Sequence, residues 1–317
     1  MDTLLTILVP TWNRRKNLEC LLEVLIPQVR ANPEVCLVIS NNASPDDTAE
    51  YLRRWESEQR VRIIHQPCNL GGSIHVAWLY GQATSPYLWV IGDDDLLEMD
   101  TVETLIAKIK SHPGLGWIHL PGIHELRDGL PPIYTRCPQT EQRVSPAREL
   151  FPSYISYLGW MTSNVIQTNA LQKKLPTVTF LTVWWPQDLL MGSVGDLPAL
   201  VLATRKVKAG PNSTWANEAG DILVCQFPRS IVESSWLSRK EKRACLMQRY
   251  AEQAGYYRHL FRLDKILFLR VTSLVPALLF STSFFTKGLG RIWKGPLSKL
   301  LPSDKTSSRV SGGKKSA

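Results

Sequence analysis

The feature that most constrains this chain is a regular alternation of short apolar runs and amphipathic segments over its first 120 residues. The apolar runs predict strands because they hold β-branched and aromatic residues and end at Gly, Pro, Asn or Asp. The expected strands are 4–9, 35–40, 61–64, 87–91 and 115–120, and the expected helices are 15–26 (with Pro27 near its end), 45–59, one from the 69–73 loop to 80, and 100–111. Such βαβ units predict an α/β fold with a mainly parallel, Rossmann-like sheet and helices on both faces.

Polar loops follow three of these strands directly. They are Pro10–Asn13, Asn41–Asp47 and Gly92–Asp95. In a parallel sheet the ligand crevice lies outside the carboxyl ends of the strands. We therefore expect the three loops to meet at one rim and to form a ligand site there.

The third loop carries three consecutive carboxylates, Asp93, Asp94 and Asp95, at the end of an apolar run. Adjacent carboxylates repel each other, so a cation is expected beside them. A divalent metal fits, because hard cations take oxygen ligands and share them with phosphates. The alternative is a solvated acidic turn in which Asp95 or Asp100 only caps the next helix.

The middle of the chain is less regular. Residues 121–146 are rich in Pro, Gly and charge and predict a long excursion, either a hairpin or a flap. Residues 153–165 suit either a surface for a polar, ring-shaped ligand or a core strand with an aromatic edge. Residues 184–191 predict a helix with Pro186 at its start, where Asp188 can simply complement the helix dipole. Residues 197–203 predict a further strand.

The C-terminal part is predicted to be helical and basic, with one mixed-charge helix over 231–260. Residues 265–285 are apolar but are interrupted by Arg270 and Pro276, so the segment is borderline for a membrane-spanning helix. From Lys287 onward eight basic residues stand against Asp304 alone. We expect an interfacial helix and a polybasic tail that favour an anionic membrane surface. The alternative is a core-packing helix followed by a disordered tail.

The six cysteines form no C-x-x-C pair, so neither a zinc knuckle nor a redox motif is indicated. Met1–Thr3 leads straight into a strand without the basic region of a signal peptide. We expect a cytoplasmic protein, peripheral on the inner face of the cell membrane.

Four blocks of the chain, taken together, resemble family 2 glycosyltransferases with the GT-A fold. They are Thr6–Arg14, Val38–Asp46, Asn69–Gly72 and Gly92–Leu97, in the family's order and spacing. The Gly-Asp-Asp-Asp sequence and residues 158–164 are more similar to O-antigen transferases related to abequosyltransferase. The resemblance covers about the first 120 residues.

The resemblance implies a set of site residues. The nucleotide donor would contact Pro10, Thr11, Asn13, Asn41, Asn69, Gly72, Asp93 and Asp94. Asn41 would recognise the base where the family usually has Asp, and Asp93 would reach the ribose. Asp94 and Asp95 would hold a divalent cation, Mn2+ or Mg2+. Gly92 departs from the family pattern, because it stands where the first Asp of the usual D-x-D-D motif is found.

The implied reaction is an inverting transfer of one sugar from a nucleoside diphosphate to an acceptor hydroxyl. Asp188 matches the catalytic base, in a Gln-Asp pair where Glu-Asp is common, and Trp160, Ser163 and Trp185 would contact the acceptor. The processive Q-x-x-R-W signature is absent. The expected acceptor is a saccharide or lipid-linked saccharide of bacterial surface polysaccharide synthesis.

The expected organisation is a GT-A domain over 1–225, with a nucleotide-sugar half (1–120) and an acceptor half (121–225). A helical region (226–300) and a disordered basic tail (301–317) follow. Two other functions stay open: a non-catalytic nucleotide-sugar-binding or membrane-adapter protein, and a nucleotidyltransferase. The latter usually has a glycine-rich phosphate loop, which residues 11–16 lack. Nucleic acid is not the expected partner.

Overall fold

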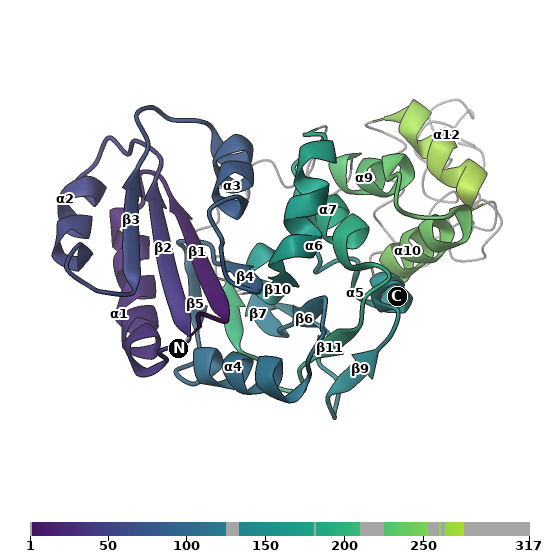
Figure 1. The fold of residues 1–317 in the computed structure, drawn as a ribbon. Coiled ribbons are helices and arrows are strands. Elements are labelled where there is room, and N and C mark those ends of the chain that lie inside the picture. The colour runs from purple at the N-terminus through teal and green to yellow at the C-terminus, as the bar shows by residue number, and fades with distance from the viewer. Residues whose placement is uncertain are drawn as a thin grey trace, which may run out of the picture.

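An eight-stranded sheet runs through the protein in the order β3-β2-β1-β4-β10-β6-β11-β9 (Figure 1). The computed structural model describes residues 2–124, 133–180, 182–209, 225–252, 260 and 264–275. In sheet order the strands are β3 (Val61–His65), β2 (Val35–Asn41), β1 (Leu5–Thr11), β4 (Tyr87–Val90), β10 (Asn164–Gln167), β6 (Trp117–His119), β11 (Ala199–Val201) and β9 (Gln142–Val144).

The N-terminal half of this sheet is parallel, as predicted. Strand β1 pairs with β2 and β4 in parallel, and β2 pairs with β3. Strand β10 is antiparallel to both β4 and β6. The first strand is a continuous apolar run because helices cover both faces of the sheet, and Leu5, Ile7, Leu8 and Val9 are fully buried.

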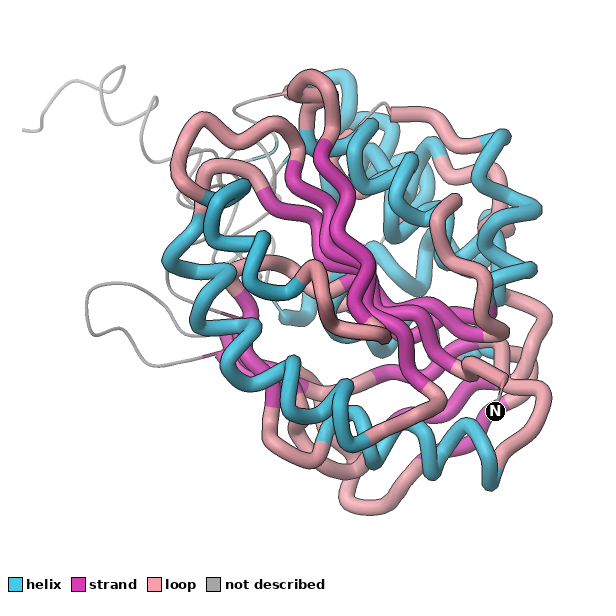
Figure 2. Tube along the Cα trace, turned by 60° about the vertical axis from the view of Figure 1, so that its left-hand side comes forward, coloured by secondary structure: helices cyan, strands magenta, loops and turns pink. Residues whose placement is uncertain are grey.

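Two apolar cores result, one on each face, and Figure 2 shows the helical layers on the two sides of the twisted sheet. Ile7 and Trp89 point into the core beneath α1 (Arg15–Ala31) and α4 (Thr101–Ser111). Leu8 and Leu88 point the other way, because successive side chains of a strand alternate between faces. The helices of that second side are α3 (Gly72–Tyr80), α5 (Phe151–Tyr154), α6 (Thr168–Lys174) and α7 (Trp185–Val194).

A second, four-stranded sheet has the order β5-β12-β7-β8. Its strands are β5 (Asp95–Leu97), β12 (Val207–Ala209), β7 (Gly122–His124) and β8 (Ile133–Tyr134). Strands β7 and β8 pair antiparallel, which agrees with the hairpin interpretation of the 121–146 excursion. Strands β5 and β12 were not predicted from the sequence, since three-residue strands carry too little pattern to be recognised.

Two helix predictions were wrong in length. Helix α1 continues through Pro27 to Ala31, because Gln28 ties its last turn to the protein: the Gln28 amide donates to the Glu98 carbonyl (3.1 Å) and accepts from the Val102 N–H (3.0 Å). The helix expected over 45–59 is shorter, with α2 at Thr48–Leu52 and a 3₁₀ turn at Arg53–Trp55. The polar residues after Trp55 offer no apolar face to bury, so helix formation gains nothing there.

The C-terminal helices pack on the α5–α7 side of the sheet (Figure 1). They are α9 (Phe227–Glu233), α10 (Arg239–Glu252) and α12 (Lys265–Leu274), so the prediction of one helix over 231–260 was wrong. The chain breaks at 234–238, where Trp236 lies against Gly192 of α7; a Cβ at Gly192 would come within 2.5 Å of that indole.

Within the described part of the chain, no helix has the length and apolar character needed to cross a membrane. Residues 276–285 of the predicted interfacial helix and the tail predicted to be disordered over 301–317 lie outside the described residues. The domain boundary at residue 225 stays a prediction.

Candidate functional site

The site is built on loops that leave the carboxyl ends of β1 and β2, whose last residues Thr11 and Asn41 are neighbours in the sheet. Asn13 and Ala43 turn these loops with positive φ angles of 54° and 55°, a left-handed conformation that is unusual for residues with a Cβ. The Asn13 N–H donates to Ser44 Oγ (2.9 Å), so each loop supports the other.

Asparagine side chains join a third loop to the first two. The Asn42 N–H donates to the Thr11 carbonyl (2.9 Å), and Asn42 Nδ2 donates to Asn69 Oδ1 (2.9 Å). Asn42 Oδ1 accepts from the Leu70 N–H (3.0 Å), and Asn69 Oδ1 accepts from the Gly71 N–H (2.8 Å). This amide network fixes the loop that opens α3 at Gly72.

Asn41, the predicted base-contacting residue, directly precedes Asn42 and is almost fully buried. Its Oδ1 accepts from the Ser44 N–H (3.0 Å), and its Nδ2 lies 3.3 Å from His65 Nδ1. As placed, the Asn41 side chain shapes the loop. Asn42, which the sequence analysis did not single out, holds the Asn69 loop.

Asp93 lies at the centre of the rim. Its carboxylate is buried and accepts from Thr11 Oγ1 (2.8 Å) and from Arg14 Nη1 (2.8 Å). The same Arg14 nitrogen is 3.2 Å from Asp94 Oδ2. Arg14 therefore neutralises part of the negative charge of these carboxylates. This role of Arg14 was not predicted from the sequence, although its position as a basic residue shortly after the first strand was an available signal.

Asp95 is held by two residues that come shortly before β10, Trp160 and Thr162. Its Oδ2 accepts from Trp160 Nε1 (2.9 Å) and from Thr162 Oγ1, whose oxygen also accepts from the Gly92 N–H (3.0 Å). The Trp160 ring lies over Gly122, where a Cβ would come within 2.6 Å of it. Trp160, predicted to contact the acceptor, thus donates a hydrogen bond to an aspartate of the acidic triplet.

The triplet carries excess negative charge. Burial raises the pKa of Asp93 to about 6; Asp94 adds to this effect, while Arg14 and Thr11 oppose it. Burial also raises the pKa of Asp95 to about 7, again with a contribution from Asp94. Desolvation without full compensation makes these carboxylates a place where a further cation would be stabilised.

Asp94 and Asp95 are suited to hold a divalent cation whose remaining ligands would come from a bound phosphate-containing molecule. Asp94 Oδ1 and Asp95 Oδ2 converge over Gly92: a Cβ there would lie 3.1 Å and 3.0 Å from them, in space that the glycine leaves open. Among the described residues, no cluster of three His, Cys, Asp or Glu could hold a metal by itself. Two carboxylates with substrate phosphates are a usual ligand set for Mg2+.

The predicted acceptor-side residues are placed differently. Ser163 is fully buried and Trp185 is almost so, with the Trp185 ring packed edge-on against Tyr80 and Phe180. As placed, neither side chain is open to a ligand. The physical reason is that both lie where β10 and α7 pack into the apolar core.

Asp188 lies in the first turn of α7 and faces the C-terminal helices. Burial raises the pKa of its carboxyl group, while hydrogen bonds from Ser234 and Trp236 and the charge of Lys242 oppose that shift. Its Oδ1 is buried without a hydrogen-bond partner. In the part of the chain that is described, no hydrogen bond or ion pair joins Asp188 to the acidic triplet.

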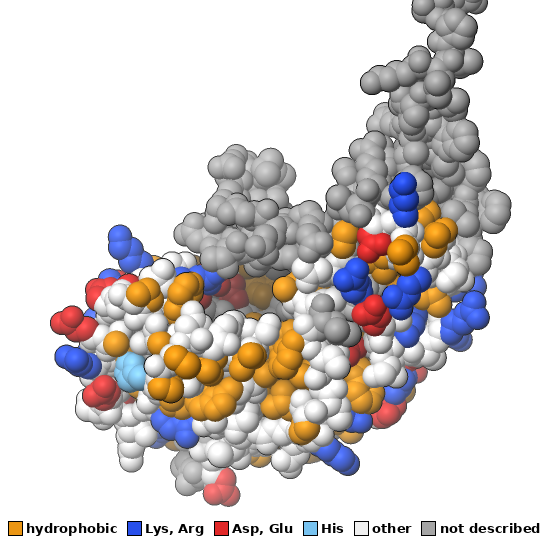
Figure 3. Space-filling model, turned by 90° about the horizontal axis from the view of Figure 1, so that it is seen from above, with side chains coloured by type: hydrophobic (Ala, Val, Ile, Leu, Met, Phe, Trp, Pro, Cys, Tyr) orange, Lys and Arg blue, Asp and Glu red, His pale blue; other side chains and the backbone are white. Residues whose placement is uncertain are grey.

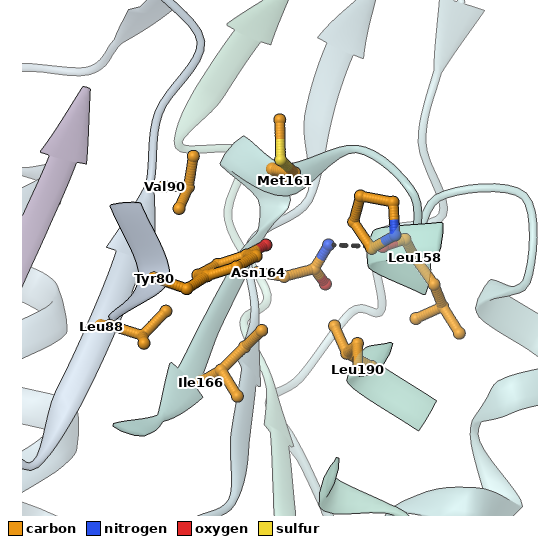
Figure 4. A pocket seen from close by; sticks show the side chains of 9 residues that line it. Tyr80, Leu88, Val90, Leu158, Met161, Asn164, Ile166 and Leu190 are labelled. Atoms are coloured by element: carbon orange, nitrogen blue, oxygen red, sulfur yellow. Dashed lines mark hydrogen bonds between the residues drawn. The ribbon is translucent and has the colours of Figure 1, made fainter. Parts of the chain in front are cut away.

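A small cavity lies between α7 and the strands β4 and β10 (Figure 4). It is lined by Tyr80, Leu88, Val90, Leu158, Met161, Asn164, Ile166, Pro186 and Leu190, and its volume of about 10 Å³ suits a single water molecule. Pro186 and Leu190 belong to the face of α7 roughly opposite to Asp188, given about 100° of rotation per residue.

The surface itself is hollowed near the middle of the upper face, where acidic and hydrophobic side chains meet (Figure 3).

Comparison with known proteins gives matches in both sequence and structure. Residues 6–156 match the model of glycosyl transferase family 2. The abequosyltransferase RfbV of Salmonella typhimurium is 33% identical over 110 residues, which cover 34% of this chain and 33% of RfbV. The chain thus spans about a third of the length of this curated relative.

Solved structures show the same fold at low sequence identity. Staphylococcus aureus TarS 1–349 in complex with UDP-GlcNAc superimposes with a TM-score of 0.63 and 15% identity, covering 86% of this chain and 82% of TarS 1–349. The mannosyltransferase PcManGT from Pyrobaculum calidifontis, in complex with GDP-Man and Mn2+, has a TM-score of 0.56 and 14% identity, with 95% and 82% covered. The fold prediction is confirmed.

Proposed function

We propose that the chain is a glycosyltransferase, because residues 6–156 match the model of glycosyl transferase family 2. It would move one sugar from a nucleoside-diphosphate donor to an acceptor hydroxyl, with inversion. The observation that carries the proposal is the rim itself: Asp93 bound by Thr11 and Arg14, beside two carboxylates that converge over Gly92.

On the donor side, the loops at Pro10, Asn13, Asn41, Asn69 and Gly72 would contact the nucleotide, and their mutual hydrogen bonds would keep the pocket shaped before binding. Asp93 would face the ribose. Asp94 and Asp95 would hold a divalent cation, Mn2+ or Mg2+, which when bound stabilises charge on a departing diphosphate. The Trp160 and Thr162 donors would keep Asp95 in place for this role.

On the acceptor side, Asp188 is the proposed base that takes the proton of the acceptor hydroxyl. The raised pKa of its carboxyl group suits a proton acceptor. The assignment rests on its position in the Gln187-Asp188 pair, since Asp188 contacts the C-terminal helices as placed. We assign no acceptor contact to Ser163 or Trp185 in this arrangement, and Trp160 is proposed to border both substrates.

We further propose a role in bacterial surface-polysaccharide synthesis on a saccharide or lipid-linked acceptor, at the inner face of the membrane. Support comes from the abequosyltransferase among the relatives and from α12. That helix exposes Ile266 and Leu269 next to Lys265 and Arg270. Apolar side chains flanked by basic ones are typical of helices that bind anionic bilayers.

Thermal unfolding of the purified chain with UDP-, GDP-, dTDP- and CDP-sugars, with and without Mn2+, tests the donor proposal. We expect one nucleotide class to raise the midpoint, and to do so more with Mn2+. Asp94→Asn should lose the Mn2+-dependent part of the shift. Asp196→Asn, an exposed carboxylate paired with Arg148, is the matched control and should retain it.

Other results would favour other functions. No shift with any nucleotide sugar would contradict the donor site and favour an adapter protein. Release of diphosphate from a nucleoside triphosphate and a sugar 1-phosphate would instead identify a nucleotidyltransferase.

A further inference from the structure

We propose that Arg14 is a built-in counter-cation of the donor site, one that competes with a divalent cation for the carboxylate of Asp94. The inference rests on the proposed function for the identity of the ligand, a divalent cation. It goes beyond that function because it assigns to Arg14 control over how tightly the cation binds before any nucleotide arrives.

The geometry places one guanidinium nitrogen between two carboxylates. Arg14 Nη1 is 2.8 Å from Asp93 Oδ1 and 3.2 Å from Asp94 Oδ2. All three side chains are largely withdrawn from solvent, with 23%, 6% and 16% of their surfaces exposed. Screening by water is therefore limited, and the interaction is stronger than that of an exposed ion pair.

The two carboxylates depend on Arg14 to different degrees. Asp93 also accepts from Thr11, so it keeps a hydrogen bond if Arg14 moves away. Asp94 has one oxygen, Oδ2, on Arg14, while its other oxygen, Oδ1, lies over Gly92 next to Asp95 Oδ2. The guanidinium and a cation bound by Asp94 and Asp95 would thus share a single carboxylate.

The backbone of Arg14 is fixed independently of these carboxylates. Its carbonyl accepts the Leu18 N–H (3.0 Å) as α1 begins. The residues on either side are held by the second loop: the Asn13 N–H donates to Ser44 Oγ (2.9 Å) and the Arg15 N–H to Asp46 Oδ2 (3.2 Å). The side chain can therefore leave Asp94 by rotating about its own bonds, without displacing the loop.

Two consequences follow from the shared carboxylate. A divalent cation and the guanidinium repel each other, so each weakens the binding of the other by the same factor. An arginine released from Asp94 keeps its planar set of N–H donors, which suits phosphate oxygens. Arg14 would thus stabilise the acidic rim without a cation and would yield Asp94 when one binds.

Titration of the full chain with Mn2+ in the absence of nucleotide tests the proposal, with free Mn2+ measured by electron paramagnetic resonance. Arg14→Gln should bind Mn2+ about 5- to 50-fold more tightly than the wild type, within the usual range of coupling between sites. Arg14→Lys keeps the charge but offers fewer donors, so it should fall between the two. Arg62→Gln removes an exposed arginine that bonds Gln82, and it should leave the affinity unchanged.

A second measurement separates competition from damage to the fold. Without metal, Arg14→Gln should have a lower thermal midpoint than the wild type, because two carboxylates lose their counter-charge, and Mn2+ should restore more of the midpoint than it adds to the wild type. An unchanged or weaker Mn2+ affinity in Arg14→Gln would overturn the proposal, as would no Mn2+ binding by that variant. Failure of the proposed function would appear instead as absent nucleotide-sugar stabilisation, which this titration does not use.

Discussion

Buried carboxylates have different surroundings at the rim formed by the loops after β1, β2 and β4 and in helix α7. At the rim, Asp93 is held by Thr11 and Arg14, and Asp95 by Trp160 and Thr162. In α7, Asp188 has a buried oxygen without a hydrogen-bond partner, and so have both amide atoms of its neighbour Gln187. Buried polar atoms without partners cost free energy. The rim is thus organised by the chain itself, whereas α7 has hydrogen bonds to gain from water, an acceptor or a shift of the C-terminal helices.

Replacement of Asp188 should have the largest effect on activity. It tests whether α7 has a catalytic role or only a structural one. We expect Asp188→Asn to lower kcat by about 10²- to 10⁴-fold, the usual contribution of a positioned general base. KM for the donor and the thermal midpoint should change little, because the amide preserves the shape of the side chain. Steady-state kinetics with the donor identified by thermal shift provide the measurement.

The exposed Asp196 again offers a control, since Asp196→Asn should keep full turnover. If Asp188→Asn turns over normally but unfolds at a lower temperature, Asp188 links α7 to Ser234, Trp236 and Lys242 and is not the base.

The pH dependence of the free energy of unfolding tests the buried carboxylates of the rim, and Asp95 in particular. The folded-state pKa of Asp95 is raised to about 7, above the usual value near 4. The protonated form therefore favours the folded state, and this contribution is lost as the pH rises from about 4 to about 7. Asp95→Asn removes the titration. In metal-free buffer, the free energy of unfolding of the variant relative to that of the wild type should therefore increase by roughly 1–3 kcal/mol between pH 5 and pH 8.

Urea unfolding at the two pH values measures this difference. His75 and His119 act in the opposite direction, because burial lowers their pKa to about 4 and their contribution is lost as the pH falls from 6.5. Both proteins contain these histidines, so subtracting one profile from the other cancels their contribution and leaves that of Asp95 with its charge interactions with Asp93 and Asp94. A difference that is equal at pH 5 and pH 8 would mean that Asp95 does not titrate in this interval.

The smallest expected effect concerns the surface of the C-terminal helices. Replacement of Ile266 and Leu269 by Ser should weaken binding to vesicles that contain anionic lipid by about tenfold, because each side chain loses apolar area that would be buried in the bilayer surface. Vesicle sedimentation measures the binding. Ile74→Ser, at an exposed position of α3, is the matched control in the N-terminal half. Equal binding of the wild type to neutral and anionic vesicles would contradict the proposed surface.

The sequence determined the parallel half of the sheet and the residues that stand at its rim. Strands β1, β2 and β4 are buried on both faces, so their apolar runs are visible in the sequence, and the polar residues that follow them are brought together by parallel pairing alone. Thr11 and Asp93 could be expected at one place for this reason. Their hydrogen bond confirms that they meet.

Only the tertiary structure decided what each side chain does there. That Arg14 bridges two aspartates, and that Trp160 and Thr162 hold Asp95, depends on contacts between residues 65 to 80 positions apart. The direction of Asp188 and the burial of Ser163 and Trp185 depend on how β10 and α7 pack between the sheet and the C-terminal helices. Such packing is a property of surfaces that the chain brings together after its strands and helices have formed, and a local pattern of residue types carries little information about it.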